Sequence, residues 1–169
     1  MITIEPPSSL SNSALSKAGL TRFLNRARSS VGLEGEVDVL LADDSTLRRL
    51  NRAFRGKNKP TDVLSFPTPE EIRQTHAGDL AISLETAARQ AAVYGHDLRD
   101  EVRILLLHGL LHLSGLDHET DDGEMAAREA ELRRELRLPT TLIERIHAPK
   151  AKKRGTQVRT ATSKRGRRV

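Results

Sequence analysis

The run ILLLHGLLHL at residues 104–113 constrains the fold more than any other part of the sequence, because seven of its ten residues are aliphatic. Wound as a helix, the run is apolar on nearly every side, and a helix of that kind is buried. It falls well short of the ~20 residues needed to span a bilayer. We therefore expect a globular protein that buries this helix, which opens at Asp97 or Arg99.

Periodicity and turn residues divide the rest of the chain into short strands and amphipathic helices. Strands are predicted at residues 2–4, 37–42, 63–66 and 78–83. Further helices are predicted at residues 12–31, from the capping residues 43–45 through Leu50, at 84–94 and at 121–138. Because strands and helices follow one another irregularly, this order favours an α+β domain with a small mixed sheet over a doubly wound sheet.

The basic residues are concentrated at the end of the chain. Residues 148–169 carry nine Lys or Arg and no acid, which leaves 19 of the 28 Lys and Arg against 23 Asp and Glu before them. With few apolar residues, this segment cannot repay its ordering entropy. We predict a single domain over residues 1–147 and a disordered basic tail over 148–169. The tail either holds nucleic acid through phosphate contacts or serves as a solubilising extension.

Composition also restricts the compartment and the metal chemistry. The sequence contains no cysteine, so a bound transition metal must be held by His, Asp or Glu. The first residues, MITIEPPSS, have neither the basic segment nor the apolar core of a secretory signal. We therefore expect a cytoplasmic protein without a membrane partner.

Three histidines lie in and after the apolar run. His108 and His112 are one helical turn apart on the same face, and Ser114-Gly115 ends the helix so that His118 can return to them. Three imidazoles leave a fourth tetrahedral position open, as in a catalytic zinc site, so we predict one zinc ion per chain. Nickel or copper would suit the same ligands. The remaining histidines, predicted to lie on the surface without a matching partner, are His76, His96 and His147.

Gly109 stands where the zinc peptidase motif HExxHxxGxxH carries its catalytic glutamate. A conventional peptidase is therefore disfavoured. A glycine inside a helix costs about 1 kcal/mol relative to alanine, which suggests a need for room. The room is needed either for a neighbouring element of the core or for a bulky substrate beside the metal.

With these residues in view, the chain resembles the YbeY family of bacterial metal-dependent endoribonucleases, which act in ribosomal RNA maturation. The family pattern HGxLHLxGxDH is matched at every fixed position from His108 to His118. Further similar blocks are LNRAFRGKNKPTDVLSFP at residues 50–67, GDLAIS at 78–83 and YGHDLRDE before the histidine helix. The resemblance, which covers most of residues 36–138, implies a single α+β domain, a zinc ion held by the three histidines, and a role for Arg55 in RNA processing. It also implies the small ribosomal subunit and its proteins as partners.

Cleavage of RNA needs groups that stabilise negative charge and move a proton. Arg55 has the planar fork that suits phosphate, although by charge alone it is a solvated loop cation. Asp117 would take the proton or orient a ligand histidine, or it simply shapes a turn. The nucleophile is either water or the 2′-hydroxyl of the RNA. Weaker candidates for a supporting role are Lys57, Lys59, Asp62 and Asp79.

The four aromatic residues, Phe23, Phe54, Phe66 and Tyr94, all fit apolar periodic positions. A stacking platform for bases is therefore not expected, and RNA binding should be ionic.

Together with the three-histidine site, the resemblance to the YbeY family implies a single-strand-specific, zinc-dependent endoribonuclease that acts in 3′-end maturation of small-subunit ribosomal RNA and in ribosome quality control. One alternative is a metallopeptidase or another metallohydrolase that uses Asp117 as its base. The other is a ribosome-assembly factor with a structural metal and no catalysis.

Overall fold

The computed structural model describes residues 1–10 and 15–139. The predicted domain boundary at residue 147, the predicted basic tail and His147 lie outside these residues.

Within residues 1–10 and 15–139 the sheet has four strands: β1 (Ile2–Ile4), β2 (Glu36–Ala42), β3 (Val63–Pro67) and β4 (His76–Ser83). They lie in the order β1-β2-β4-β3. Strands β1 and β4 run parallel to β2, whereas β3 runs antiparallel to β4. The sheet is therefore mixed, which confirms the predicted α+β class in a single small domain.

The described helices are α1 (Lys17–Val31), α2 (Asp44–Arg55), α3 (Leu84–Tyr94), α4 (Leu98–Leu113) and α5 (Glu124–Leu136), with a short 3-10 helix, η2 (Glu70–Ile72), between β3 and β4. Four of them begin at a residue whose side chain accepts a backbone N–H of the first turn, namely Ser16, Asp43, Ser83 and Asp97. Asp97, and not Arg99, thus opens the apolar helix. Helix α5 begins later than predicted. Asp121 lies in the turn before it, and its carboxylate accepts the N–H groups of Gly123 in that turn and of Met125 in the first turn of the helix.

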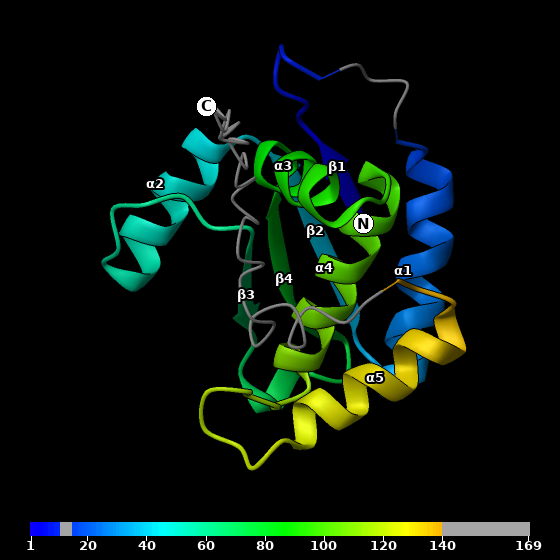
Figure 1. Ribbon diagram of the computed structural model, residues 1–169. Helices are drawn as coiled ribbons and strands as arrows, with labels where there is room; N and C mark the ends of the chain where they lie inside the picture. The colour runs from blue at the N-terminus through cyan, green and yellow to red at the C-terminus, as the bar shows by residue number, and fades with distance from the viewer. Residues whose placement is uncertain (11–14, 140–169) are drawn as a thin grey trace, which may run out of the picture.

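Helix α4 lies against the sheet, with α1 and α5 beside it (Figure 1). Nearly all of its second half is buried, from Ile104 through Leu111, so the predicted buried helix is confirmed.

Helix α2 stands apart in Figure 1 and packs on the opposite face of the sheet, because Leu47 joins Ala81 in a core cluster separate from that of α4. No helix in the described ranges is long and apolar enough to cross a membrane.

Gly109 makes close packing of α4 on the sheet possible. A Cβ atom at this position would lie 2.8 Å from Cδ2 and 3.0 Å from Cδ1 of Leu80, a buried residue of β4. The room that the glycine provides is therefore occupied by the core and not by a substrate.

Candidate metal centre

The rings of His108, His112 and His118 meet at the end of α4, as the spacing predicts. The ring centroids of His108 and His112 are 4.7 Å apart, and His118 lies 5.3 and 5.5 Å from them. One candidate ligand nitrogen from each ring lies within 4.8 Å of the other two. The Nε2 atoms of His108 and His112 are 3.1 Å apart. Two nitrogens bound to one tetrahedral ion at about 2.0–2.1 Å would stand about 3.3 Å apart, so this pair fits a shared cation.

The chain reversal that brings His118 to the pair depends on Gly115. Its φ of +97° lies in the left-handed region, and its N–H donates to the carbonyl of His112 at 3.0 Å. The N–H of Leu116 donates to the carbonyl of Leu111, so the last turn of α4 is closed. A Cβ atom at Gly115 would meet nothing within 4 Å, so the glycine serves backbone conformation and not space.

A buried carboxylate that sequence reasoning missed supports His108. Oε2 of Glu129 lies 3.4 Å from Nδ1 of His108, and the two residues are only 1% and 4% exposed. In the tautomer with its proton on Nδ1, His108 would donate to this oxygen and leave the lone pair of Nε2 for a cation. Its spacing in the sequence could have indicated that it is buried. Glu129 lies four residues after Met125 and three before Leu132, on the buried face of α5.

The nitrogen Nδ1 of His118 is buried and has no hydrogen-bond partner. A buried polar atom without a partner is destabilising by about 1–3 kcal/mol, so such atoms are rare. Together with three neutral nitrogen donors and no thiolates, this orphaned atom fits a bound transition metal.

The protonation state of His112 also suits a metal ligand. Burial is the largest cause that lowers the pKa of His112 to about 4, and electrostatic repulsion from His108 and His118 adds to it. The carboxylate of Asp117 acts in the opposite direction. The imidazole is therefore neutral near pH 7, with a lone pair available.

The histidines open into a cleft of about 570 Å³. Other residues that line it include Arg55, Asp62, Gln90, Tyr94, Asp117 and Glu119. Arg55 is the last residue of α2, the helix on the other face of the sheet from α4. The fold thus brings the exposed side chain of Arg55 to the cleft, although it lies far from the three histidines in the sequence. The structure thus brings together both predicted catalytic residues and the three histidines.

Asp117 is held in the turn before His118. Its Oδ1 accepts the N–H of Glu119 at 3.0 Å, and its carbonyl accepts the N–H groups of Thr120 and Asp121. The hydrogen bond from Glu119 is the main cause of a lowered pKa of Asp117. Desolvation opposes it, and His112 and His118 add to the lowering. The side chain is therefore an ionised carboxylate that also shapes the turn.

The two weaker carboxylate candidates have different positions. Asp62 lines the cleft, where it accepts the N–H of Val63 at 2.8 Å and Nε2 of Gln90 at 3.2 Å. Asp79 lies elsewhere, 3.3 Å from Nε2 of His76. With Asp38 these two residues form a second group whose ligand atoms lie within 4.8 Å, but all three are partly exposed and Asp38 pairs with the Met1 ammonium at 2.8 Å.

The prediction that His76 and His96 have no partner is wrong, and His96 also departs from its predicted surface position. His76 pairs with Asp79, and Nε2 of His96, whose side chain is 10% exposed, bonds to the carboxylate of buried Glu101. The aromatic prediction also fails in part, because Phe54 and Tyr94 are 68% and 45% exposed. Phe54 contacts Phe66 edge to face, with ring centroids 5.1 Å apart. Tyr94 lies in the cleft.

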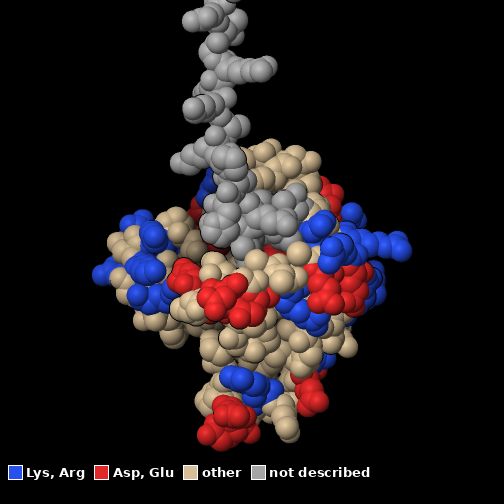
Figure 2. Space-filling model, turned by 60° about the horizontal axis from the view of Figure 1, so that its bottom comes forward, with Lys and Arg blue, Asp and Glu red and all other residues tan. Residues whose placement is uncertain are grey.

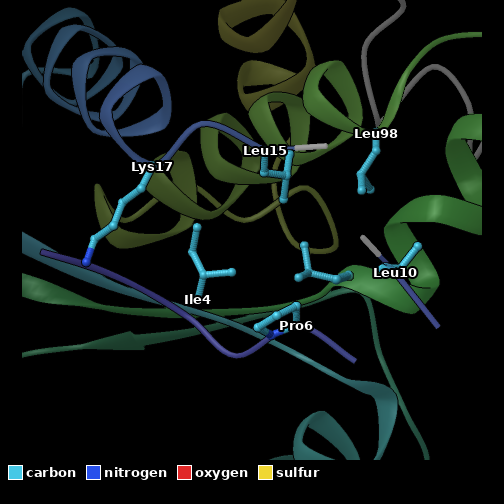
Figure 3. Close-up of a pocket in the computed structure, with 7 residues that line it drawn as sticks. Ile4, Pro6, Leu10, Leu15, Lys17 and Leu98 are labelled. Carbon is cyan, nitrogen blue, oxygen red and sulfur yellow. The ribbon is translucent and has the colours of Figure 1, made fainter. Parts of the chain in front are cut away.

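A second cavity, of about 330 Å³, lies at the other end of α4, beside its first residue, Leu98 (Figure 3). Its remaining lining consists of Ile4, Pro6, Leu10, Leu15, Lys17 and Leu84. Lys17 is the single charged residue among the described members of this lining, which therefore offer no group of candidate catalytic or metal-binding side chains.

Comparison with known proteins gives a consistent result. A family model described as Endoribonuclease YbeY matches residues 8–137. Curated relatives with the same name include those of Koribacter versatilis, 52% identical over 82% of this chain and 89% of that protein, and Solibacter usitatus, 47% identical over 79% and 88%. The solution structure of TM1509 from Thermotoga maritima is similar with a TM-score of 0.55 and 29% identity, covering 80% of this chain and 89% of that one.

Proposed function

Because the chain belongs to the YbeY family of endoribonucleases, and is thus a hydrolase that acts on RNA, we propose that it cleaves single-stranded RNA with one zinc ion held by His108, His112 and His118. The observation that carries the proposal is the convergence of three imidazoles in a cleft that Arg55 also lines. When bound, zinc supplies a positive charge that polarises a phosphoryl oxygen.

Arg55 and Asp117 are the proposed catalytic residues. The guanidinium of Arg55 binds the nonbridging oxygens of the scissile phosphate, where negative charge grows during cleavage. The ionised carboxylate of Asp117 lies beside the imidazoles and accepts the proton of the nucleophile. Glu129 holds His108 in the tautomer that presents Nε2.

The surface beside the cleft supports an RNA substrate. Lys and Arg gather over α2 and the loop after it, at the left of Figure 2. This α2 basic surface consists of the exposed residues Arg48, Arg49, Arg52, Arg55, Lys57 and Lys59. Within the described part of the chain, none of the six forms an ion pair with a carboxylate. They are therefore available to phosphates, and Arg55 joins this surface to the cleft.

The biological substrate that we propose is the 3′ region of small-subunit ribosomal RNA, with a second role in ribosome quality control. Ribosomal proteins and assembly factors are the proposed partners, and the cytoplasm is the compartment that follows from such a substrate. The resemblance of the sequence blocks at residues 50–67 and 108–118 to the family supports this assignment.

The first test compares metal content with RNA cleavage. The protein is stripped of metal, reloaded with zinc and assayed on a single-stranded RNA, on the same RNA in a duplex and on casein. We expect one zinc per chain and cleavage of the single strand alone. Equal activity without metal, or cleavage of casein, would contradict the proposal. A different stoichiometric metal would overturn the zinc assignment.

Two variants separate metal binding from phosphate binding. His112→Ala should lose the metal and cleavage together while circular dichroism shows a retained fold. Arg55→Ala should keep one metal per chain and lose roughly 100-fold in kcat, as when a charge-stabilising donor is removed. Arg52→Ala is the comparison variant. Arg52 is exposed on the same helix and belongs to the α2 basic surface but does not line the cleft, so its loss should raise the KM for RNA and leave kcat unchanged. Full ribosome assembly by a cleavage-deficient Arg55→Ala protein would instead favour an assembly factor.

End-group analysis of the product identifies the nucleophile. A 5′-phosphate indicates attack by water, and a cyclic 2′,3′-phosphate indicates attack by the 2′-hydroxyl of the RNA.

A further inference from the structure

Tyr94 is an exposed aromatic residue inside the candidate active-site cleft. It is the last residue of α3, it is 45% exposed, and it lines the cleft together with Arg55 and the three histidines. A single exposed aromatic residue on a protein surface is ordinary. Tyr94, however, lines the same cleft as the proposed metal ligands and Arg55, so a substrate bound in this cleft would lie next to its ring.

The Tyr94 ring lies next to a histidine whose own position is fixed by a buried carboxylate. Gly95, with φ of +74°, ends the helix in the left-handed conformation and turns the chain toward His96. The rings of Tyr94 and His96 are nearly parallel, with an interplanar angle of 13° and centroids 6.4 Å apart. His96 is held in turn by its bond to Glu101, a fully buried residue of α4. The ring is therefore partly preorganised, which reduces the entropy lost on binding.

We propose that Tyr94 stacks on an unpaired nucleobase of the RNA whose phosphate lies at Arg55. The proposal rests on the function proposed above and deepens it by naming a residue that selects single strands. Every base has an aromatic face, so stacking on a tyrosine tolerates any sequence. A base within a duplex is already stacked on its neighbours and must be extruded first, so the same contact discriminates against duplex RNA.

The cleft has the size and chemistry for this arrangement. Its volume of about 570 Å³ lies within the range of pockets that hold small ligands of nucleotide size. Arg55 supplies a charge for the phosphate, and Tyr94 supplies an aromatic face for the base. Binding thus combines an ionic contact with a stacking contact, where the sequence alone predicted an ionic one.

The composition of the chain makes the contact directly measurable. Tyr94 is the single tyrosine and tryptophan is absent, so intrinsic fluorescence reports on Tyr94 alone. The zinc-loaded full chain is titrated with a short single-stranded RNA whose riboses are 2′-O-methylated and whose linkages are phosphorothioate, which slows cleavage. An abasic oligomer with the same backbone and a blunt duplex are the comparisons, and free tyrosine amide corrects for light absorbed by the nucleic acid.

We expect the single strand to quench the fluorescence and the abasic oligomer and the duplex to leave it nearly unchanged. Equal quenching by the abasic oligomer, or no quenching by the base-bearing strand, would overturn the stacking contact. If the protein cleaves RNA in a zinc-dependent manner without quenching, Tyr94 alone is misassigned. If quenching is seen and zinc-dependent cleavage is not, the proposed function fails and the stacking contact stands.

Substitutions of Tyr94 distinguish a stacking effect of its ring from an effect of its hydroxyl. Tyr94→Ala should raise KM and Kd for single-stranded RNA about tenfold with a smaller change in kcat, in line with stacking on one base. Tyr94→Phe should keep both constants near their original values. Val93→Ala is the matched control, since Val93 is 77% exposed on the same helix and does not line the cleft. A Tyr94→Phe protein as impaired as Tyr94→Ala would assign the effect to the hydroxyl and refute stacking.

Discussion

The carboxylate of Glu129 on α5 lies 3.4 Å from Nδ1 of His108 on α4, and both side chains are buried. This contact joins the candidate metal centre to the last described helix. The two carboxylates can therefore have different roles. Glu129 orients His108 from within the core, whereas Asp117 lines the cleft, where it can accept a proton.

Replacing Glu129 with glutamine should weaken metal binding about 10- to 100-fold, because loss of the carboxylate weakens the orientation and basicity of His108. Competition with a chelator of known affinity measures this change. Glu131→Gln, on the exposed side of the same helix, is the control and should leave affinity unchanged. Equal metal affinity in the Glu129→Gln protein would show that the contact does not support the centre.

Replacing Gly109 with alanine should destabilise the protein, even though alanine favours a helix by about 1 kcal/mol. The new methyl group would lie 2.8 Å from Leu80, and overpacking of a core costs about 1–3 kcal/mol. Denaturant unfolding measures the difference. In a Leu80→Ala background the same substitution should become neutral or stabilising, and the absence of this reversal would mean that Leu80 is not the obstacle.

Asp44 makes the free energy of unfolding depend on pH in the acid range. It accepts hydrogen bonds from Ser83, Thr86 and Arg89 at 2.5, 2.6 and 2.8 Å, and so links α2 to the start of α3. Burial by itself would raise the pKa of Asp44, but these three bonds outweigh it and the pKa is lowered.

Because the folded pKa lies below the unfolded value of about 3.9, the ionised Asp44 stabilises the fold above that pH, and the stabilisation is lost as the pH falls through the folded pKa. Asp44→Asn should therefore lose about 1–3 kcal/mol of unfolding free energy at pH 7 and much less in strong acid. Denaturant titrations at the two pH values test this. Asp122→Asn, at an exposed position, is the control, and a loss that is the same at both pH values would argue against the linkage.

Deleting residues 150–169 should flatten the salt dependence of RNA binding, because the deletion removes nine Lys and Arg. For a single strand, each phosphate that the protein no longer neutralises reduces the slope of log affinity against log salt by about 0.7. Affinity is measured at several salt concentrations for the full and shortened chains. An unchanged slope would show that residues 150–169 do not bind phosphates, and phosphate binding would then be assigned to the α2 basic surface and the cleft.

Short-range patterns explain why some features were predictable. His108 and His112 lie four residues apart in a helix, and the conformational freedom of Gly115 ends that helix, so local geometry alone predicts that His118 returns to the pair. The buried character of α4 likewise follows from its aliphatic composition.

Other features depend on contacts between elements that are distant in the sequence. The sequence left two reasons open for Gly109, and only the packing of α4 on β4 identifies Leu80 as the cause. Tyr94 fitted an apolar position by spacing, yet it is exposed in the cleft, because periodicity does not tell whether the last turn of a helix still has a covering neighbour.

The sequence by itself therefore determined a buried helix, a three-histidine cluster and the α+β class, since these depend on residue type and spacing within one or two turns. The tertiary structure decided that Glu129, rather than Asp79 or Asp62, contacts one of the three candidate metal ligands, and that Arg55 and Tyr94 line the same cleft. These contacts join segments that lie 20 or more residues apart in the chain, and side-chain packing across the whole core, rather than local backbone preference, sets their distances.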